Sequence, residues 1–107
     1  MNRRLNGVYC DLAGTLFKIG TGEVDENILA ILKEYSKTQN VTLWTGGDLD
    51  DAQKDLDSAK IDFPLVSKYR HEGDNAEIVI DDLPQSDFEK RYKICSREYI
   101  QVKPNDL

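Results

Sequence analysis

The segment "GVYCDLAGTLF" (residues 7–17) places Asp11 at the end of a short apolar run and then breaks into Ala-Gly-Thr. The run includes the β-formers Val8 and Tyr9, and an apolar stretch of this length is typical of a buried parallel strand. A carboxylate at the tip of such a strand is costly unless it is paired or used. The segment therefore predicts a strand that carries a functional carboxylate to the edge of a sheet.

Strands and helices alternate through the first two-thirds of the chain. Apolar residues at helical spacing predict helices over 24–37 and about 49–59, and residues 87–94 predict a helical turn. Glycines at 14, 20 and 22 predict a turn and flexible loop before the first helix. Strands are predicted at 5–11, 41–45, 64–68, 77–80 and 99–102, before Pro104. The alternation favours an α/β domain, a three-layer Rossmann-like fold with a mainly parallel sheet.

Length and charge narrow the classes of function. The chain has 107 residues, so residues 1–107 are expected to form a single domain. Twenty acidic residues against 14 basic ones give a net charge of −6, and the basic residues are scattered, which makes nucleic acid an unlikely partner. No apolar run approaches the roughly 20 residues of a membrane span. Two cysteines without metal-ligand spacing, and no secretory leader, predict a cytoplasmic protein.

Chemically active side chains follow the ends of the predicted strands. Ligands of open α/β sheets bind beyond the carboxyl ends of the strands, so these positions are where a site is expected. The first strand ends on Asp11, the second on Thr45 before two glycines, and the third on Ser67 and Lys68. The fourth ends on Asp81 and Asp82. A carboxylate, a hydroxyl, an ammonium group and a carboxylate pair are thus predicted to converge on one edge.

Each of these residues also has an ordinary structural explanation as a cap, a turn residue or a surface charge. Together they point to a site, because three carboxylates at one edge repel one another unless a hard cation lies among them. Magnesium is the natural candidate, since it takes oxygen ligands and bridges to phosphate. Thr45 and Lys68 are then expected to hold phosphoryl oxygens, which leaves Asp11 free to attack phosphorus.

The set resembles the haloacid dehalogenase (HAD) superfamily, whose members are mostly phosphohydrolases that pass through an aspartyl-phosphate. "DLAGTL" (11–16) is similar to the family's first motif, Asp-x-Asp-Gly-Thr-Leu, in every fixed place except one. "LWTGG" (43–47) resembles the second motif and "IVIDD" (78–82) the fourth. Lys68 best matches the lysine of the third motif, with Lys60 as the alternative.

The resemblance implies a role for each position. Asp11 would be the nucleophile and a magnesium ligand, and the backbone carbonyl of Ala13 would also face the metal. Asp81 and Asp82 would complete the metal shell. Thr45 would bind the phosphoryl group, and Lys68 would neutralise the charge that builds up during transfer. The implied function is that of a magnesium-dependent phosphohydrolase acting on a phosphorylated substrate.

Ala13 is the departure from the family pattern. In the family's phosphatases this position holds an aspartate that protonates the leaving oxygen and later deprotonates the attacking water, and loss of such a group costs about 10²- to 10⁴-fold in rate. Two explanations stay open: a deliberate alanine substitution, or a natural variant that serves as a catalytically silent binding or regulatory protein. The family's phosphonate-cleaving branch also has alanine here, but it needs a cap domain for which this chain has no room.

The expected absence of a cap implies an open site, because caps shield small substrates from water. A phosphorylated protein, a nucleic-acid end or a partner subunit that supplies the lid would suit it, with nucleic acid the least favoured. A homo-oligomer is one way to close such a site. A phosphoacceptor receiver domain is the main rival class, but receivers place the acidic pair after the first strand. Cys10 and Trp44 are expected to pack in the core, and His71 to lie solvated in a polar loop.

Overall fold

The structure is a computed structural model that describes residues 3–103. The five strands in this part of the chain are all parallel and lie in the order β3-β2-β1-β4-β5, which confirms the predicted α/β architecture. The elements follow one another as β1 (Arg4–Asp11), α1 (Glu26–Tyr35), β2 (Val41–Thr45), α2 (Leu49–Ser58), β3 (Leu65–Ser67), the 3-10 helix η1 (Lys68–His71), β4 (Asn75–Asp81), α3 (Gln85–Tyr92) and β5 (Cys95–Gln101).

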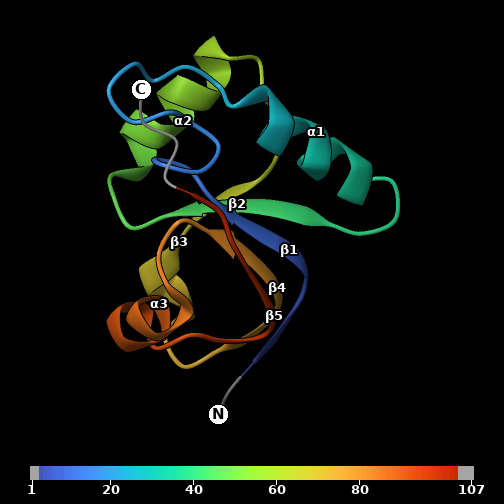
Figure 1. Ribbon diagram of the computed structural model, residues 1–107, viewed down its shortest axis with the longest axis vertical. Coiled ribbons are helices and arrows are strands. Elements are labelled where there is room, and N and C mark those ends of the chain that lie inside the picture. Colours follow the sequence, from blue (N-terminus) through green and yellow to red (C-terminus); the bar gives the residue numbers. More distant parts are fainter. Residues whose placement is uncertain (1–2, 104–107) are drawn as a thin grey trace.

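The helices cover both faces of the sheet and create three layers (Figure 1). Ile28 of α1 and Leu56 of α2 belong to one core cluster, which packs against Val8, Cys10 and other residues of the central strands. Phe88 and Tyr92 of α3 belong to a second cluster on the other face, together with Trp44. Two apolar cores therefore hold β1, β2 and β4 from both sides, and the carboxyl ends of these strands are fixed in place.

Side-chain caps decide where the first two helices begin. Asp25 accepts hydrogen bonds from the backbone N–H groups of Asn27 (3.0 Å) and Ile28 (3.2 Å), so α1 begins two residues later than predicted. Asp48 accepts one from Asp51 N–H (2.9 Å) at the start of α2. Both caps satisfy N–H groups that have no partner within the helix.

The last third of the chain is more regular than its sequence pattern predicts. The turn expected at 87–94 is a helix over residues 85–92, and β5 covers 95–101 in place of 99–102. Strand β4 starts at Asn75, two residues earlier than predicted. Pro104 lies outside the described residues, so the predicted end of the last strand at that proline is not described.

An irregularity in β1 sets the register of the two central strands. The pairing of β1 with β4 shifts between Leu5 and Val8, and Gly7 lies in this interval with φ of +87°. A Cβ atom at Gly7 would lie 2.3 Å from the Asn40 carbonyl oxygen, so only glycine fits. Beyond the shift Cys10 is paired with Ile80, and the strands end side by side.

No cap domain is inserted in the described chain. Residues 12–25, between β1 and α1, contain turns and the isolated bridges Ala13–Phe17 and Phe17–Val24. The connection from β3 to β4 contains only η1 and a turn. Within residues 3–103, no helix has the length and apolar character needed to cross a lipid bilayer.

Candidate active site

The candidate site lies where the strand order reverses. The chain runs outward from β1 through β2 to β3, then returns to place β4 on the other side of β1. Ligands of such sheets bind in the crevice beyond the carboxyl ends at this switch point. A depression of about 370 Å³ is found there, and all of the predicted site residues line it: Asp11, Ala13, Thr45, Lys68, Asp81 and Asp82.

Lys68 is the centre of the charge network. Its Nζ atom lies 2.8 Å from Asp11 Oδ1 and 3.0 Å from Asp81 Oδ2, and the residue is only 2 % exposed. The ammonium group also lies 4.6 Å from the ring centroid of Tyr92, whose π face favours a cation. Lys60 is exposed at the end of α2 and is not among the residues lining the site. Of the two lysines, only Lys68 is placed to act on a ligand there.

Burial shifts the protonation of this network. Desolvation raises the pKa of Asp11 to about 7, against the lowering effect of Lys68, and Asp81 raises it further. Burial likewise raises the pKa of Asp81. For Lys68, burial alone would lower the pKa, but the carboxylates of Asp11 and Asp81 outweigh it and keep the pKa above its usual value. The lysine therefore stays charged, while the two carboxyl groups compete for its stabilisation.

The acidic residues can hold a metal ion. Asp11, Asp81 and Asp82 each offer a carboxylate oxygen within 4.8 Å of the others. A Cβ atom at Gly14 would lie 2.6 Å from Asp82 Oδ2, so the glycine makes room for that carboxylate. A donor set made of oxygen atoms suits a hard cation such as Mg²⁺ and does not suit softer metals that prefer sulfur and nitrogen. The residues present therefore fit the magnesium ion expected from the sequence.

Two threonines support the carboxylate and the ligand space. Thr15 is fully buried and donates from Oγ1 to Asp11 Oδ2 at 3.3 Å, which orients the oxygen that Lys68 does not hold. Thr45 accepts a hydrogen bond from Gly47 N–H at 3.0 Å, and its own O–H remains a donor for a ligand. Thr15 had no predicted role, although it lies within the "DLAGTL" segment.

Among residues 3–103, four further residues line the depression that the sequence did not single out: Tyr69, Leu83, Arg91 and Tyr92. The Tyr69 and Tyr92 rings lie 5.4 Å apart, and Tyr69 is 55 % exposed. A Cβ atom at Gly46 would lie 2.8 Å from the Tyr92 hydroxyl, so the glycine after Thr45 makes room for α3. The sequence signal was the four-residue spacing of Phe88 and Tyr92, which indicates a packed helix face but not a site.

Ala13 also lines the depression, and it is exposed. Its methyl group neither donates nor accepts a proton. Position 13, where the resemblance leads us to expect a general acid and base, thus lies beside the carboxylates, but its side chain cannot transfer a proton. Any reaction here has to proceed without proton transfer from residue 13.

Cys10 and Trp44 are both fully buried and pack in the two cores, as predicted. The prediction that His71 is solvated is wrong: the residue is 8 % exposed. Its Nδ1 atom lies 3.0 Å from Asp74 Oδ2, and its ring lies 5.9 Å from that of Tyr9. The Asp74 carboxylate gives the ring nitrogen a hydrogen-bond partner, and this allows the imidazole to be buried against Tyr9 and Trp44.

Comparison with known proteins gives no match, whether with protein-family models, with curated proteins or with solved structures. The fold and the site define a parallel α/β protein with an acidic, lysine-centred crevice at its switch point. What that crevice does is inferred from its geometry.

Proposed function

We propose that this chain is a HAD-type, magnesium-dependent phosphohydrolase that acts through an aspartyl-phosphate on Asp11, and that its turnover is impaired because residue 13 is alanine. The observation that supports it most is the position of Asp11 at the switch point, 2.8 Å from the Lys68 ammonium group. Asp81 and Asp82, which lie within 4.8 Å of Asp11 by their carboxylate oxygens, supply the metal ligands.

Each residue has a defined part in the proposed reaction. Magnesium, held by the three aspartates, would neutralise charge on the phosphoryl oxygens. A carboxylate oxygen of Asp11 forms a bond to phosphorus as the bond from phosphorus to the leaving oxygen breaks. Lys68 and the Thr45 hydroxyl stabilise the charge on the transferring group. The leaving group departs as an anion or takes its proton from water, because Ala13 offers none.

Alanine at position 13 is expected to slow the second step, the hydrolysis of the aspartyl-phosphate, more than the first. Hydrolysis of the aspartyl-phosphate needs a water molecule that loses a proton as it attacks, and no side chain at position 13 accepts it. The covalent intermediate is therefore expected to accumulate. This same observation supports the second candidate, a catalytically silent HAD-like protein that binds a phosphorylated ligand or regulates a partner without turning anything over.

The proposed substrate is a phosphate monoester on a bulky carrier. No cap domain covers the depression in the described chain, so a large phosphorylated molecule can reach Asp11. A phosphorylated protein fits better than nucleic acid, since the net charge of −6 opposes a polyanion. A second copy of the chain that supplies the lid is the alternative for a small substrate.

The deciding experiment is a rapid-mixing assay with magnesium and an activated aryl phosphate, comparing the chain with Ala13→Asp. The good leaving group needs no acid, so the chain as it stands should release a burst of about one product per site and then stall. Ala13→Asp should convert the burst into steady turnover. Asp11→Asn should release none, which serves as the control for reaction at another group.

Lys60 offers a matched control for Lys68. Lys68→Met should abolish the burst, because the ammonium group no longer stabilises the transferring phosphoryl group. Lys60→Met removes the same charge from an exposed position and should leave the burst unchanged. Absence of product from both the chain and Ala13→Asp would exclude the phosphohydrolase and leave the silent binding protein.

A further inference from the structure

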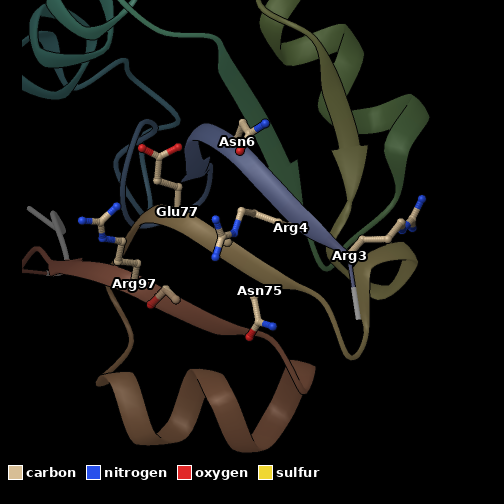
Figure 2. Close-up of a pocket in the computed structure, with 8 residues that line it drawn as sticks. Arg3, Arg4, Asn6, Asn75, Glu77 and Arg97 are labelled. Carbon is tan, nitrogen blue, oxygen red and sulfur yellow. The ribbon is translucent and has the colours of Figure 1, made fainter. Parts of the chain in front are cut away.

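A second depression lies at the opposite end of the sheet. It measures about 660 Å³ and is lined by residues at the amino ends of β1, β4 and β5 (Figure 2). Glu77 lines this depression and Asp81 lines the candidate active site, and these residues are four positions apart along β4, which corresponds to about 13 Å at about 3.3 Å per residue. The two depressions therefore have no residue in common and can bind different ligands.

The charge of this depression is opposite to that of the whole chain. Arg3, Arg4 and Arg97 line it, in a protein whose net charge is −6. Arg3 is held by Asp74, with 3.4 Å between guanidinium nitrogen and carboxylate oxygen. Arg4 and Arg97 make no ion pair with any residue in 3–103. Two guanidinium groups are thus available to an anion.

Within the described part of the chain, Glu77 is the only acidic residue lining the depression, and its carboxylate is already engaged. Figure 2 shows the Glu77 side chain rising between Arg4 and Arg97. Its Oε2 atom accepts a hydrogen bond from Gly7 N–H at 3.1 Å, within the irregular part of β1. Glu77 therefore supports the backbone of β1, and the arginines keep their donors.

The remaining polar residues lining the depression are Asn6, Asn75 and Ser96, whose side chains can both donate and accept hydrogen bonds. Strand register places Asn75 beside Arg4, and Ser96 beside Ala76. The Ser96 hydroxyl is buried and has no hydrogen-bond partner among the described residues. Ser96 shares the sheet face of Ala76, which belongs to the second core cluster, so its hydroxyl makes no contact with a ligand beside Arg4. Asn6 adds a further side-chain amide at the rim.

We propose that this depression binds a small organic phosphate. The guanidinium fork matches the geometry of phosphoryl oxygens, and Arg4 and Arg97 lie on the two strands that flank β4, so both can reach one ligand. A volume of about 660 Å³ lies in the range of small-molecule sites and exceeds what a bare ion fills. The side-chain carbonyl groups of Asn6 and Asn75 supply acceptors for hydroxyl groups on the carrier. This site needs no metal and is independent of the proposed phosphohydrolase.

The test is a titration of the metal-free protein with ribose 5-phosphate, followed by backbone amide NMR. Amide signals of residues 3–7, 75–77 and 95–97 should move, while those of 11–15 and 45–47 stay in place. Ribose without its phosphate should move neither set, and inorganic phosphate should bind more weakly than ribose 5-phosphate. Signals that move only at the carboxyl ends would overturn the proposal, as would equal affinity for inorganic phosphate, which indicates a bare-anion site.

Arginine variants distinguish specific binding in the depression from general attraction of the anion to positive charge. Arg4→Gln and Arg97→Gln should each weaken binding about tenfold, the typical loss for one charge-assisted hydrogen bond. Arg70→Gln removes the same charge from an exposed residue that lines neither depression and should leave the affinity unchanged. Equal weakening by all three variants would reduce the effect to net charge and overturn the proposal. The aryl phosphate assay tests the reaction at Asp11 separately, so its outcome does not depend on whether this depression binds a ligand.

Discussion

At the scale of single residues, the candidate site keeps one cation and two carboxylates almost completely out of water. Lys68, Asp11 and Asp81 are 2 %, 7 % and 0 % exposed, and the lysine bonds both acids. A buried pair of this kind adds little stability by itself, but removal of one partner leaves an uncompensated charge. The network is therefore better explained by a task at the site than by a contribution to folding.

Removal of Lys68 should destabilise the protein in a pH-dependent manner. The carboxyl of Asp11 has a folded pKa of about 7, above the ordinary 3.8, and Lys68 is what holds it that low. In Lys68→Met the folded pKa rises further, so the folded state loses stability as the pH rises through and above neutrality. By urea unfolding, we expect the loss to be about 1 kcal/mol or more larger at pH 8 than at pH 5, because each pH unit above the wild-type pKa of about 7 adds about 1.4 kcal/mol.

Lys60→Met is the control for this experiment, since it removes an exposed lysine and should change stability by less than about 0.5 kcal/mol at either pH. The interpretation fails if Lys68→Met costs the same at pH 5 as at pH 8, because the loss would then come from packing.

The contribution of Asp74 to the free energy of unfolding should have the opposite pH dependence, since it is lost as the pH falls. Burial opposes its ionisation, but hydrogen bonds from His71 and Arg3 outweigh this and lower its pKa. The stability that this carboxylate contributes is present above its unfolded pKa of 3.8 and is lost as the pH falls below it. Asp74→Asn should therefore destabilise the protein at pH 7 and flatten the decline of unfolding free energy between pH 5 and 2. An unchanged acid decline would contradict this.

At the scale of elements, the central strands were predictable because local pattern and global fold agree there. The run that ends on Asp11 and the "LWTGG" segment predict the carboxyl ends of β1 and β2 correctly. The sequence pattern predicts only a helical turn in place of α3, because only Phe88 and Tyr92 are buried in this helix and it begins without a side-chain cap. His71 was misplaced because its partner Asp74 comes from the following turn, and that pairing exists only after η1 has packed under the sheet.

The register of the site also depended on an element-scale feature that no motif marks. Gly7 lies within the strand run itself, and nothing in the pattern indicates that it approaches Asn40 so closely. Lys68, by contrast, could be predicted from its place just after a strand, and the structure favours it over Lys60 by burial and distance.

Gly7→Ala should test this irregularity, with Gly20→Ala as the matched control. Both glycines have positive φ, +87° and +93°, so each substitution costs about 1–2 kcal/mol of backbone strain. A Cβ atom at Gly7 also meets the Asn40 oxygen at 2.3 Å, whereas one at Gly20 meets nothing within 4 Å. Urea unfolding should therefore show a clearly larger loss for Gly7→Ala. Equal losses would mean that the strand accommodates the methyl group.

At the scale of the whole molecule, β1 and β4 connect two surfaces of opposite charge. The carboxyl ends of these strands present Asp11, Asp81 and Asp82, and the amino ends lie beside Arg4 and Arg97. A cation is favoured at one end of the sheet and an anion at the other. The net charge of −6 does not reveal this separation. It results from the parallel alignment of the strands, which gathers their carboxyl ends at one edge of the sheet and their amino ends at the other.

Magnesium should therefore stabilise the whole fold, because the three carboxylates converge only in the folded chain. A ligand at 100 times its Kd adds about 2.7 kcal/mol, which for a domain of this size raises Tm by more than about 10 °C. Asp82→Asn removes one ligand without touching Lys68 and should abolish most of this rise, while sodium at matched ionic strength should produce none in either protein. An equal rise in Asp82→Asn would place the magnesium elsewhere and remove the metal from the proposed site.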